Sequence, residues 1–213
     1  MRPLVVLLLT AALAAAAPSA AAIAAPSKCQ RLTGRDIAPA ASVKLVAHRN
    51  GDDGTDLLGC VLPRGPVRQI ASSADFYTTV EGYAVQQIAG RAVLVETTSS
   101  SQYAYSQSLS VYHLRTGRSY RVAGTCSMIG GDDCASGGSS TAPAAFVTAK
   151  GRAVALVVRA GVAAVTAFNT LGTPRVLDSG PPAAIAPESL RLDAGFASWT
   201  NAGIARSAPI APG

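Results

Sequence analysis

Two stretches of this sequence repeat one another, and the repeat constrains the architecture more than any single residue does. Residues 90–95 lead on to residues 109–117, and residues 151–157 lead on to residues 165–172. Each stretch reads as an apolar strand, a connection and a second apolar strand that ends in a turn with Thr and Gly. Weaker copies lie on either side. Such repeats are typical of folds built from similar supersecondary units.

The N-terminus has the order of residues found in a secretory signal. Met1 and Arg2 precede an apolar run over residues 4–17, and small residues follow. Cleavage after Ala22 or after Ala24 fits the small-residue pattern of signal peptidase sites. The alternative is an uncleaved anchor, but the leucine-rich part is too short to span the bilayer. We therefore expect a signal peptide at 1–24, an N-terminal segment at 25–42, and an exported domain at 43–213 without stable membrane insertion.

The sequence holds four cysteines, and an exported chain meets an oxidising compartment. Two disulfides are therefore expected, and of the three possible pairings we favour the sequential one, Cys29–Cys60 with Cys126–Cys134. The second bond would close a short, glycine-containing loop. A metal site is the alternative, and the spacing disfavours it because no C-x-x-C pair is present.

The region after the signal is a series of short runs rich in Val, Leu, Tyr and Thr, separated by Gly, Pro, Asn and Asp. Such a pattern predicts many strands joined by tight turns. The expected strands are residues 43–48, 57–62 and 67–70 in a first unit, 83–88, 91–96, 108–114 and 119–123 in a second, 145–148, 153–158, 162–168 and 175–177 in a third, and 189–192, 196–200 and 204–208 in a fourth.

Some of these strands, such as residues 153–158, are apolar on both faces. A two-layer sandwich exposes one face of each sheet, so its strands should alternate between apolar and polar residues. Burial of both faces is expected where blades stack around an axis. We therefore predict an all-β, β-propeller-like fold of about four small antiparallel blades, closed by strands shared between the two ends, with a β-sandwich as the alternative.

A family resemblance supports that interpretation. Residues 109–117 resemble the blade signature of extracellular β-propellers, although His113 stands where the usual turn aspartate would be and the next unit has Ala167. Residues 187–192 followed by 196–203 are similar to the last blade of uncharacterised secreted propeller-like proteins from actinobacteria. The resemblance implies a propeller-like fold. It implies no activity, because one fold hosts many functions.

Charge and motifs exclude several classes of function. The formal net charge is +6, but the arginines are scattered along the chain, with no basic run interleaved with aromatic residues, so nucleic acid is not expected as a partner. The histidines, His48 and His113, lack a partner motif for catalysis, and a structural role is expected for both. Residues 50–56 are rich in oxygen ligands but lack the closing glutamate of a calcium loop, which favours a solvated turn. No metal or cofactor is predicted.

Two candidate functional regions remain. Glu81, Glu96, Asp178 and Glu188 lie near strand ends, where acids gathered in a channel could make the chain a glycoside hydrolase or lyase. The second region is the Tyr- and Ser-rich stretch 97–107, which has the composition of a binding loop. Its candidate binding residues are Gln102, Tyr103 and Tyr105, although the stretch can equally be an extension of two strands. We expect a secreted, non-catalytic binding or structural module for an extracellular protein or glycan, with the enzyme as the alternative.

Overall fold

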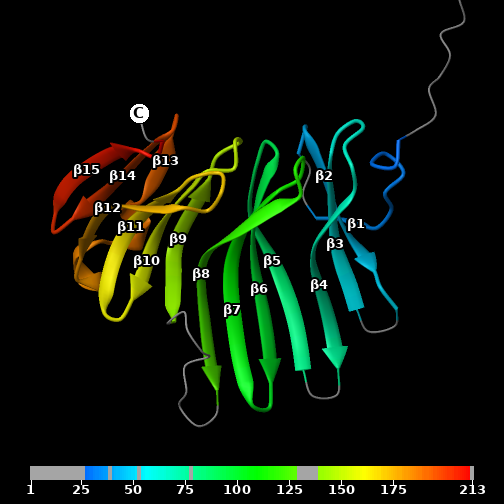
Figure 1. Cartoon of the computed structure of the whole chain (residues 1–213), viewed down its shortest axis with the longest axis horizontal. Coiled ribbons are helices and arrows are strands. Elements are labelled where there is room, and N and C mark those ends of the chain that lie inside the picture. The colour runs from blue at the N-terminus through cyan, green and yellow to red at the C-terminus, as the bar shows by residue number, and fades with distance from the viewer. Residues whose placement is uncertain (1–26, 38–39, 52–53, 77–78, 129–138, 212–213) are drawn as a thin grey trace, which may run out of the picture.

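The computed structural model consists of β-strands joined by short turns, as the sequence pattern predicts (Figure 1). It describes residues 27–37, 40–51, 54–76, 79–128 and 139–211. Two single-turn 3-10 helices are the helical segments of this described part. None of its helices is long and apolar enough to cross a membrane. The expected signal peptide at 1–24 lies outside the described residues.

Twelve strands form one antiparallel sheet in sequence order, and three form a second sheet. The strands of the first sheet are β1 (Arg35–Asp36), β2 (Val43–Arg49), β3 (Gly54–Val61), β4 (Arg68–Phe76), β5 (Thr79–Ala89), β6 (Ala92–Ser101), β7 (Ala104–His113), β8 (Arg118–Met128), β9 (Ser140–Val147), β10 (Ala153–Arg159), β11 (Val162–Phe168) and β12 (Pro174–Gly180). The second sheet contains β13 (Arg191–Asp193), β14 (Phe196–Asn201) and β15 (Ile204–Pro209), and the 3-10 helices η1 (Pro182–Ala184) and η2 (Pro187–Ser189) precede it.

The predicted four-blade propeller is wrong. Hydrogen-bonded pairing continues across the expected blade boundaries, from β4 to β5 and, through Gly124 and Ser140, from β8 to β9. Within the described residues, β1 and β12 are the two edges of the long sheet, and no strand joins them into a ring. β4 and β5 pair through the residues at the end of β4 and the start of β5, and β8 pairs with β9 through Gly124 in the middle of β8. The layered, open arrangement fits the β-sandwich alternative.

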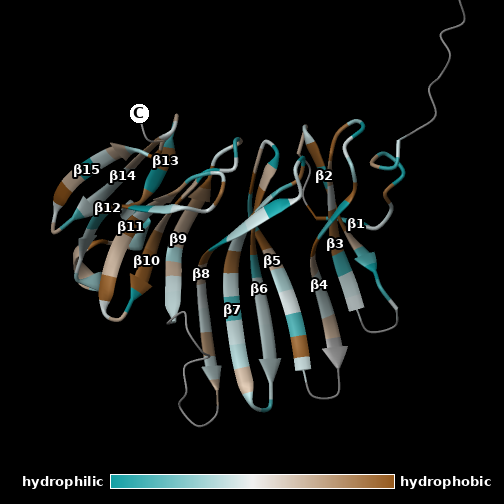
Figure 2. Cartoon of the chain, in the orientation of Figure 1, coloured by the Kyte–Doolittle hydropathy of each residue, from teal (hydrophilic) through white to brown (hydrophobic). Residues whose placement is uncertain are grey.

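Burial of strands on both faces, from which the propeller was inferred, does occur. In β6, Val93 packs into one apolar cluster with β2, β3 and β4, whereas Leu94 packs into a second cluster with β8, β9 and β10. In β10, Ala155 belongs to that second cluster and Leu156 to a third, which includes Trp199 of β14. Successive groups of strands thus pack face to face without closing around an axis. In Figure 2, β10 is coloured mainly as hydrophobic residues, as expected for a strand that is buried on both faces.

The expected Cys29–Cys60 disulfide is present. It joins the segment before β1 to β3, and both cysteines are completely buried. Cys126 is also disulfide-bonded, while its expected partner Cys134 lies outside the described residues. Disulfide formation fits an oxidising, extracellular compartment.

Candidate functional site

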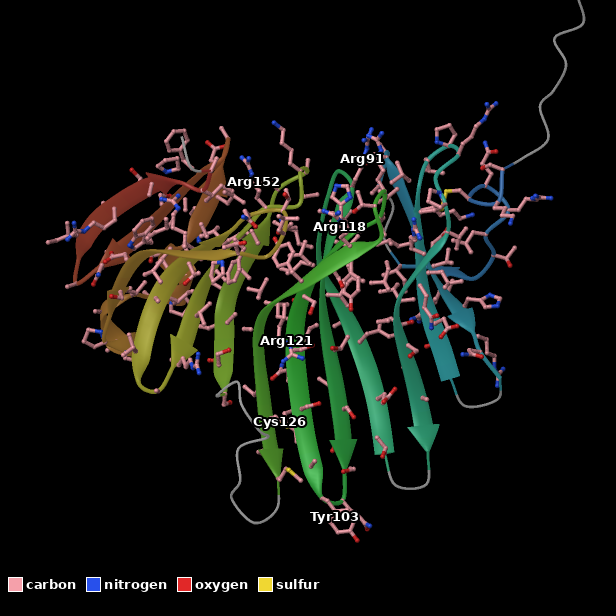
Figure 3. The ribbon with its side chains drawn as sticks, in the orientation of Figure 1. Arg91, Tyr103, Arg118, Arg121, Cys126 and Arg152 are labelled. Carbon is pink, nitrogen blue, oxygen red and sulfur yellow. A yellow bond between two sulfur atoms is a disulfide. The ribbon has the colours of Figure 1, made fainter. Side chains whose placement is uncertain are left out.

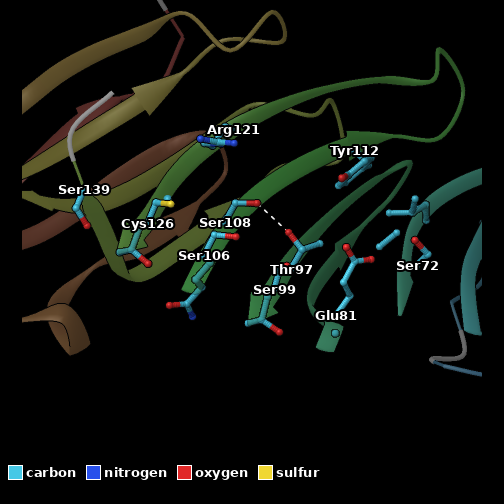
Figure 4. Close-up of a pocket in the computed structure, with 17 residues that line it drawn as sticks. Ser72, Glu81, Thr97, Ser99, Ser106, Ser108, Tyr112, Arg121, Cys126 and Ser139 are labelled. Atoms are coloured by element: carbon cyan, nitrogen blue, oxygen red, sulfur yellow. Dashed lines mark hydrogen bonds between the residues drawn. The ribbon is translucent and has the colours of Figure 1, made fainter. Parts of the chain in front are cut away.

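A cleft of about 580 Å³ is lined by residues of the neighbouring strands β4, β5, β6, β7 and β8 (Figure 4). Side-chain hydroxyls dominate its lining, and we call it the hydroxyl cleft. The hydroxyl-bearing side chains that face the cleft are those of Ser72, Thr97, Ser99, Ser106, Ser108 and Ser139.

The cleft arises because one face of β6 changes character along the strand. Side chains two residues apart share a face of a strand, so Val93, Val95, Thr97 and Ser99 point the same way. The two valines are buried in the apolar core, and the next two side chains line the cleft. On the paired strand β7 the same face carries Ser110, Ser108 and Ser106, and Ser108 lies opposite Thr97. Their hydroxyl oxygens are 2.8 Å apart and hydrogen-bonded.

Arg121 supplies a positive charge to the cleft. It lies on β8 next to a β-bulge, where the pairing with β7 shifts between Leu109 and Ser110. A bulge re-aims the side chains of its strand, and here Arg121 points into the cleft with Cys126 (Figure 4). Gly124 leaves room for the arginine stem, since a Cβ there would lie 3.3 Å from Arg121 Cδ. The cation is exposed and, within the described part of the chain, forms no ion pair.

Glu81 and Tyr112 complete the cleft from other strands. Glu81 on β5 is half-buried, and in Figure 4 the hydroxyls of Thr97 and Ser108 lie between it and Arg121. Tyr112 on β7 lies at the inner end, where the cleft meets the apolar core that includes Ile70. Burial raises the pKa of the Tyr112 hydroxyl above its ordinary value. The cleft therefore combines one cation, one anion, several hydroxyls and part of an aromatic ring.

A second cavity of about 730 Å³ lies on the opposite face of β6 and β7, against β9 and η2. Two of the four predicted acids, Glu96 and Glu188, line it together. Gln86 donates a side-chain hydrogen bond of 2.7 Å to Glu96 Oε2, and Gln107 donates another to Glu96 Oε1. The Arg191 guanidinium, also in the lining, donates to the backbone oxygens of Glu188 and Leu190.

The other two predicted acids lie elsewhere. Glu81 lines the hydroxyl cleft, and Asp178 on β12 contacts the second sheet. The hydrogen bonds from Asn201 and Trp199 hold the pKa of Asp178 below its ordinary value. The structure thus brings two of the four acids to one cavity. The central channel that was expected to gather them depends on a closed ring, which the sheet does not form.

Both histidines make local hydrogen bonds. The backbone N–H and the hydroxyl of Thr116 are 3.4 and 3.2 Å from His113 Nδ1, which fixes the turn between β7 and β8. Nδ1 of His48 lies 3.2 Å from the backbone oxygen of Thr33. The structural role that the sequence suggests for both histidines stays a prediction, with which these contacts are consistent.

The Tyr- and Ser-rich stretch forms the long hairpin of β6 and β7. Ser101 closes its tip by accepting hydrogen bonds from the backbone N–H groups of Tyr103 and Ala104. Gln102 and Tyr103 lie at the tip, where 65% of Tyr103 is exposed. Tyr105 is on the face of β7 opposite to Ser106, because adjacent residues of a strand point to opposite faces. The tyrosines therefore lie outside the cleft that the serines of the same hairpin line.

The acidic turn at residues 50–56 is described in part. Asp56 Oδ1 accepts hydrogen bonds from the side-chain amides of Asn50 and Gln69, at 3.3 and 3.1 Å. Asp52 and Asp53, which the calcium hypothesis requires, lie outside the described residues. Elsewhere in the described part, no group of three acidic, His or Cys side chains is placed to hold a metal ion.

Comparisons with protein-family models, with curated proteins and with solved structures find no match for this chain.

Proposed function

We propose that this chain is an exported, non-catalytic binding module, and that it binds a glycan bearing a carboxylate group in the hydroxyl cleft. The observation that carries the proposal is the lining of the cleft, where an exposed arginine, which forms no ion pair with any residue that the structure describes, lies among serine and threonine hydroxyls.

Each feature of the cleft matches one feature of an acidic sugar. Ser and Thr hydroxyls both donate and accept hydrogen bonds, as sugar hydroxyls do. The planar guanidinium of Arg121 can bind a carboxylate through two parallel hydrogen bonds. Tyr112 offers part of an apolar ring surface at the inner end. Glu81 can accept hydrogen bonds from sugar hydroxyls on the other side.

A binding role is favoured over hydrolysis at this cleft. Glycoside hydrolysis ordinarily uses two carboxyl groups on either side of the scissile bond. Among the described residues, Glu81 is the acid that lines the hydroxyl cleft. Arg121 would bind the carboxylate of the ligand and has no acid-base role.

Calorimetric titration with trigalacturonate, and with maltotriose as the neutral probe, tests the proposal. We expect trigalacturonate to bind and Arg121→Ser to weaken that binding by about 10- to 100-fold, the value of a charge-assisted hydrogen bond. The matched control is Arg159→Ser, which removes an exposed arginine from the end of β10. Equal binding of the two probes, or equal affinity of wild-type protein and Arg121→Ser, would contradict the proposal.

One observation supports the enzymatic alternative, an extracellular glycoside hydrolase or lyase. Glu96 and Glu188 line the same cavity, and the two glutamine amides hold the Glu96 carboxylate in place. If this cavity is the active site, Glu96→Gln and Glu188→Gln each abolish release of reducing sugar from polysaccharide substrates, and Arg121→Ser leaves it unchanged. If neither glutamate matters, the alternative fails.

A further inference from the structure

The repeat places a Gly-Arg pair at the same end of the sheet several times. Gly90, Gly117 and Gly151 lie in the turns after β5, β7 and β9, each with a positive φ that favours glycine. Arg91, Arg118 and Arg152 follow these glycines in sequence. Because consecutive strands are antiparallel, alternate turns fall at one end of the sheet. Figure 3 shows the three arginines there, opposite to the end that carries Tyr103.

The turns at this end are in close contact. A Cβ on Gly90 would lie 2.6 Å from Ala149 Cβ, and one on Gly151 would lie 3.0 Å from His113 Cδ2. Ser42 also donates a hydrogen bond of 3.0 Å to the backbone oxygen of Gly90. Cations that are scattered in the sequence are therefore brought onto one continuous surface.

Two grooves cross this surface and meet at His113. One, of about 310 Å³, is lined by Arg68 and Arg118, and the other, of about 590 Å³, by Arg91, Arg115 and Lys150. His113 lines both grooves. We call this surface, defined by these six residues, the basic track.

The described residues do not neutralise the positive charge of the basic track. Among the described residues, no Asp or Glu lines either groove. All five Arg and Lys side chains of the track are exposed, and none forms an ion pair or a side-chain hydrogen bond with the part of the chain that the structure describes. Unpaired cations gathered on one surface raise the local concentration of anions and favour an anionic partner.

We propose that the basic track binds an extended, polyanionic polysaccharide. A small anion would fill one groove, whereas the track continues through His113 from one groove to the other and suits a linear chain of charges. Nucleic acid is disfavoured because single strands are bound through exposed aromatic rings, and the exposed aromatics of the described chain are Tyr103, Tyr105 and Phe196, all outside the track. The proposal is independent of ligand binding in the hydroxyl cleft.

A charge-matched pair of variants tests the proposal. The track variant combines Arg91→Ser, Arg118→Ser and Lys150→Ser, one from each turn. The control variant combines Arg31→Ser, Arg35→Ser and Arg159→Ser, which removes three exposed arginines outside the track and leaves the same net charge. Binding to dextran sulfate and to carrageenan, two polyanions that carry sulfates and no carboxylates and so do not depend on a carboxylate site in the hydroxyl cleft, is measured by biosensor over a range of salt concentrations, with dextran as the neutral polymer.

We expect the track variant to lose about 100-fold in affinity for both polyanions, since each cation near an anionic surface gives about a fivefold gain. The control variant should stay within about twofold of wild type, and the salt dependence of binding should weaken in the track variant alone. A third variant, Arg91→Lys with Arg118→Lys and Lys150→Arg, keeps the charges and should keep the binding. Thermal unfolding of the track variant, with a Tm equal to that of wild type, shows that a loss of binding does not come from misfolding.

Three results would overturn the proposal. Equal loss in the track and control variants would mean that net charge alone drives binding. Binding that survives in the track variant would place the polyanion elsewhere. Tighter binding to single-stranded DNA, or to vesicles of phosphatidylglycerol, than to either polysaccharide would assign the surface to another class of partner.

Discussion

The indole nitrogen of Trp199 donates a hydrogen bond of 2.7 Å to Oδ2 of Asp178. This bond joins β14 of the three-stranded sheet to β12 at the edge of the twelve-stranded sheet. Asn201 donates to the same oxygen at 3.0 Å. Beside these polar contacts, Trp199 packs in an apolar cluster with Leu156 and Val165. One carboxylate thus fixes the orientation of a sheet that apolar packing holds in place.

Replacement of Asp178 should destabilise the protein measurably. Asp178→Ala leaves the Trp199 N–H, on a side chain that is 4% exposed, without its acceptor, and such a loss costs about 1–3 kcal/mol. Urea unfolding, followed by the fluorescence of the single tryptophan, measures the change. Asp193→Ala, an exposed acid in β13, is the control and should be neutral. Equal unfolding midpoints for the two variants would contradict this assignment.

Asp178 should also make stability depend on pH in the acid range. Hydrogen bonds from Asn201 and Trp199 lower the pKa of Asp178 from its ordinary 3.8, so the unfolded chain binds the proton more readily. The stabilisation is complete well above pH 3.8 and is lost as the pH falls through the lowered pKa of the folded state. Asp178→Asn removes this titration. The gap between wild-type and variant unfolding midpoints should therefore be larger at about pH 7 than at about pH 2, and a constant gap would refute the prediction.

Much of the local structure could be predicted from the sequence. The predicted strands 153–158 and 162–168 match β10 and β11, because Gly and Asn turns bound these apolar runs clearly. The Cys29–Cys60 bond followed from cysteine order and export. The predicted ring closure was wrong. Apolar residues on both faces of a strand indicate that a packed layer covers each face, but they do not indicate whether these layers close around an axis.

The candidate sites were less accessible to sequence reasoning. The stretch 97–107 was singled out for its tyrosines, yet its serines line the cleft, because strand alternation separates the two sets. Arg121 points into the cleft beside a β-bulge, and the residues around this bulge have no pattern from which it could be predicted. The basic track was missed because its charges are far apart in the sequence. The signal that could have found it was the repeated Gly-Arg pair in turns that alternate along an antiparallel sheet.

Gly59 should be intolerant of a side chain. A Cβ at this position of β3 would lie 2.6 Å from Leu45 Cδ2 and 2.8 Å from Ile70 Cδ1, inside the apolar core. Overpacking of this kind costs about 1–3 kcal/mol, which outweighs the entropic benefit of alanine over glycine. Gly180→Ala is the control, since its nearest neighbour would be at an ordinary 3.4 Å. Thermal unfolding should show a lower Tm for Gly59→Ala alone, and a similar drop in both would argue against a packing cause.

The Cys29–Cys60 disulfide should contribute strongly to stability. The cysteines are 31 residues apart, and closing a loop of this length in the unfolded chain is worth about 3–4 kcal/mol. The double variant Cys29→Ala with Cys60→Ala leaves Cys126 and Cys134 intact, which chemical reduction would not. Its urea midpoint should fall accordingly, and addition of a reductant to wild-type protein should lower the midpoint at least as far. A double variant as stable as wild type would contradict the expected loop-closure effect.

The two faces of β6 should both be essential to the fold. Val93 and Leu94 are adjacent and almost fully buried, yet they belong to different apolar clusters. Leu94→Ala should cost about 2–5 kcal/mol because it opens a cavity. Val93→Ala should cost about 2 kcal/mol because it removes two buried methyl groups. Val80→Ala, where the side chain is 56% exposed, should be nearly neutral in the same urea titration. In a sheet covered on one face, one of the two core substitutions would be tolerated, so a neutral result for either would contradict the face-to-face packing of successive strand groups.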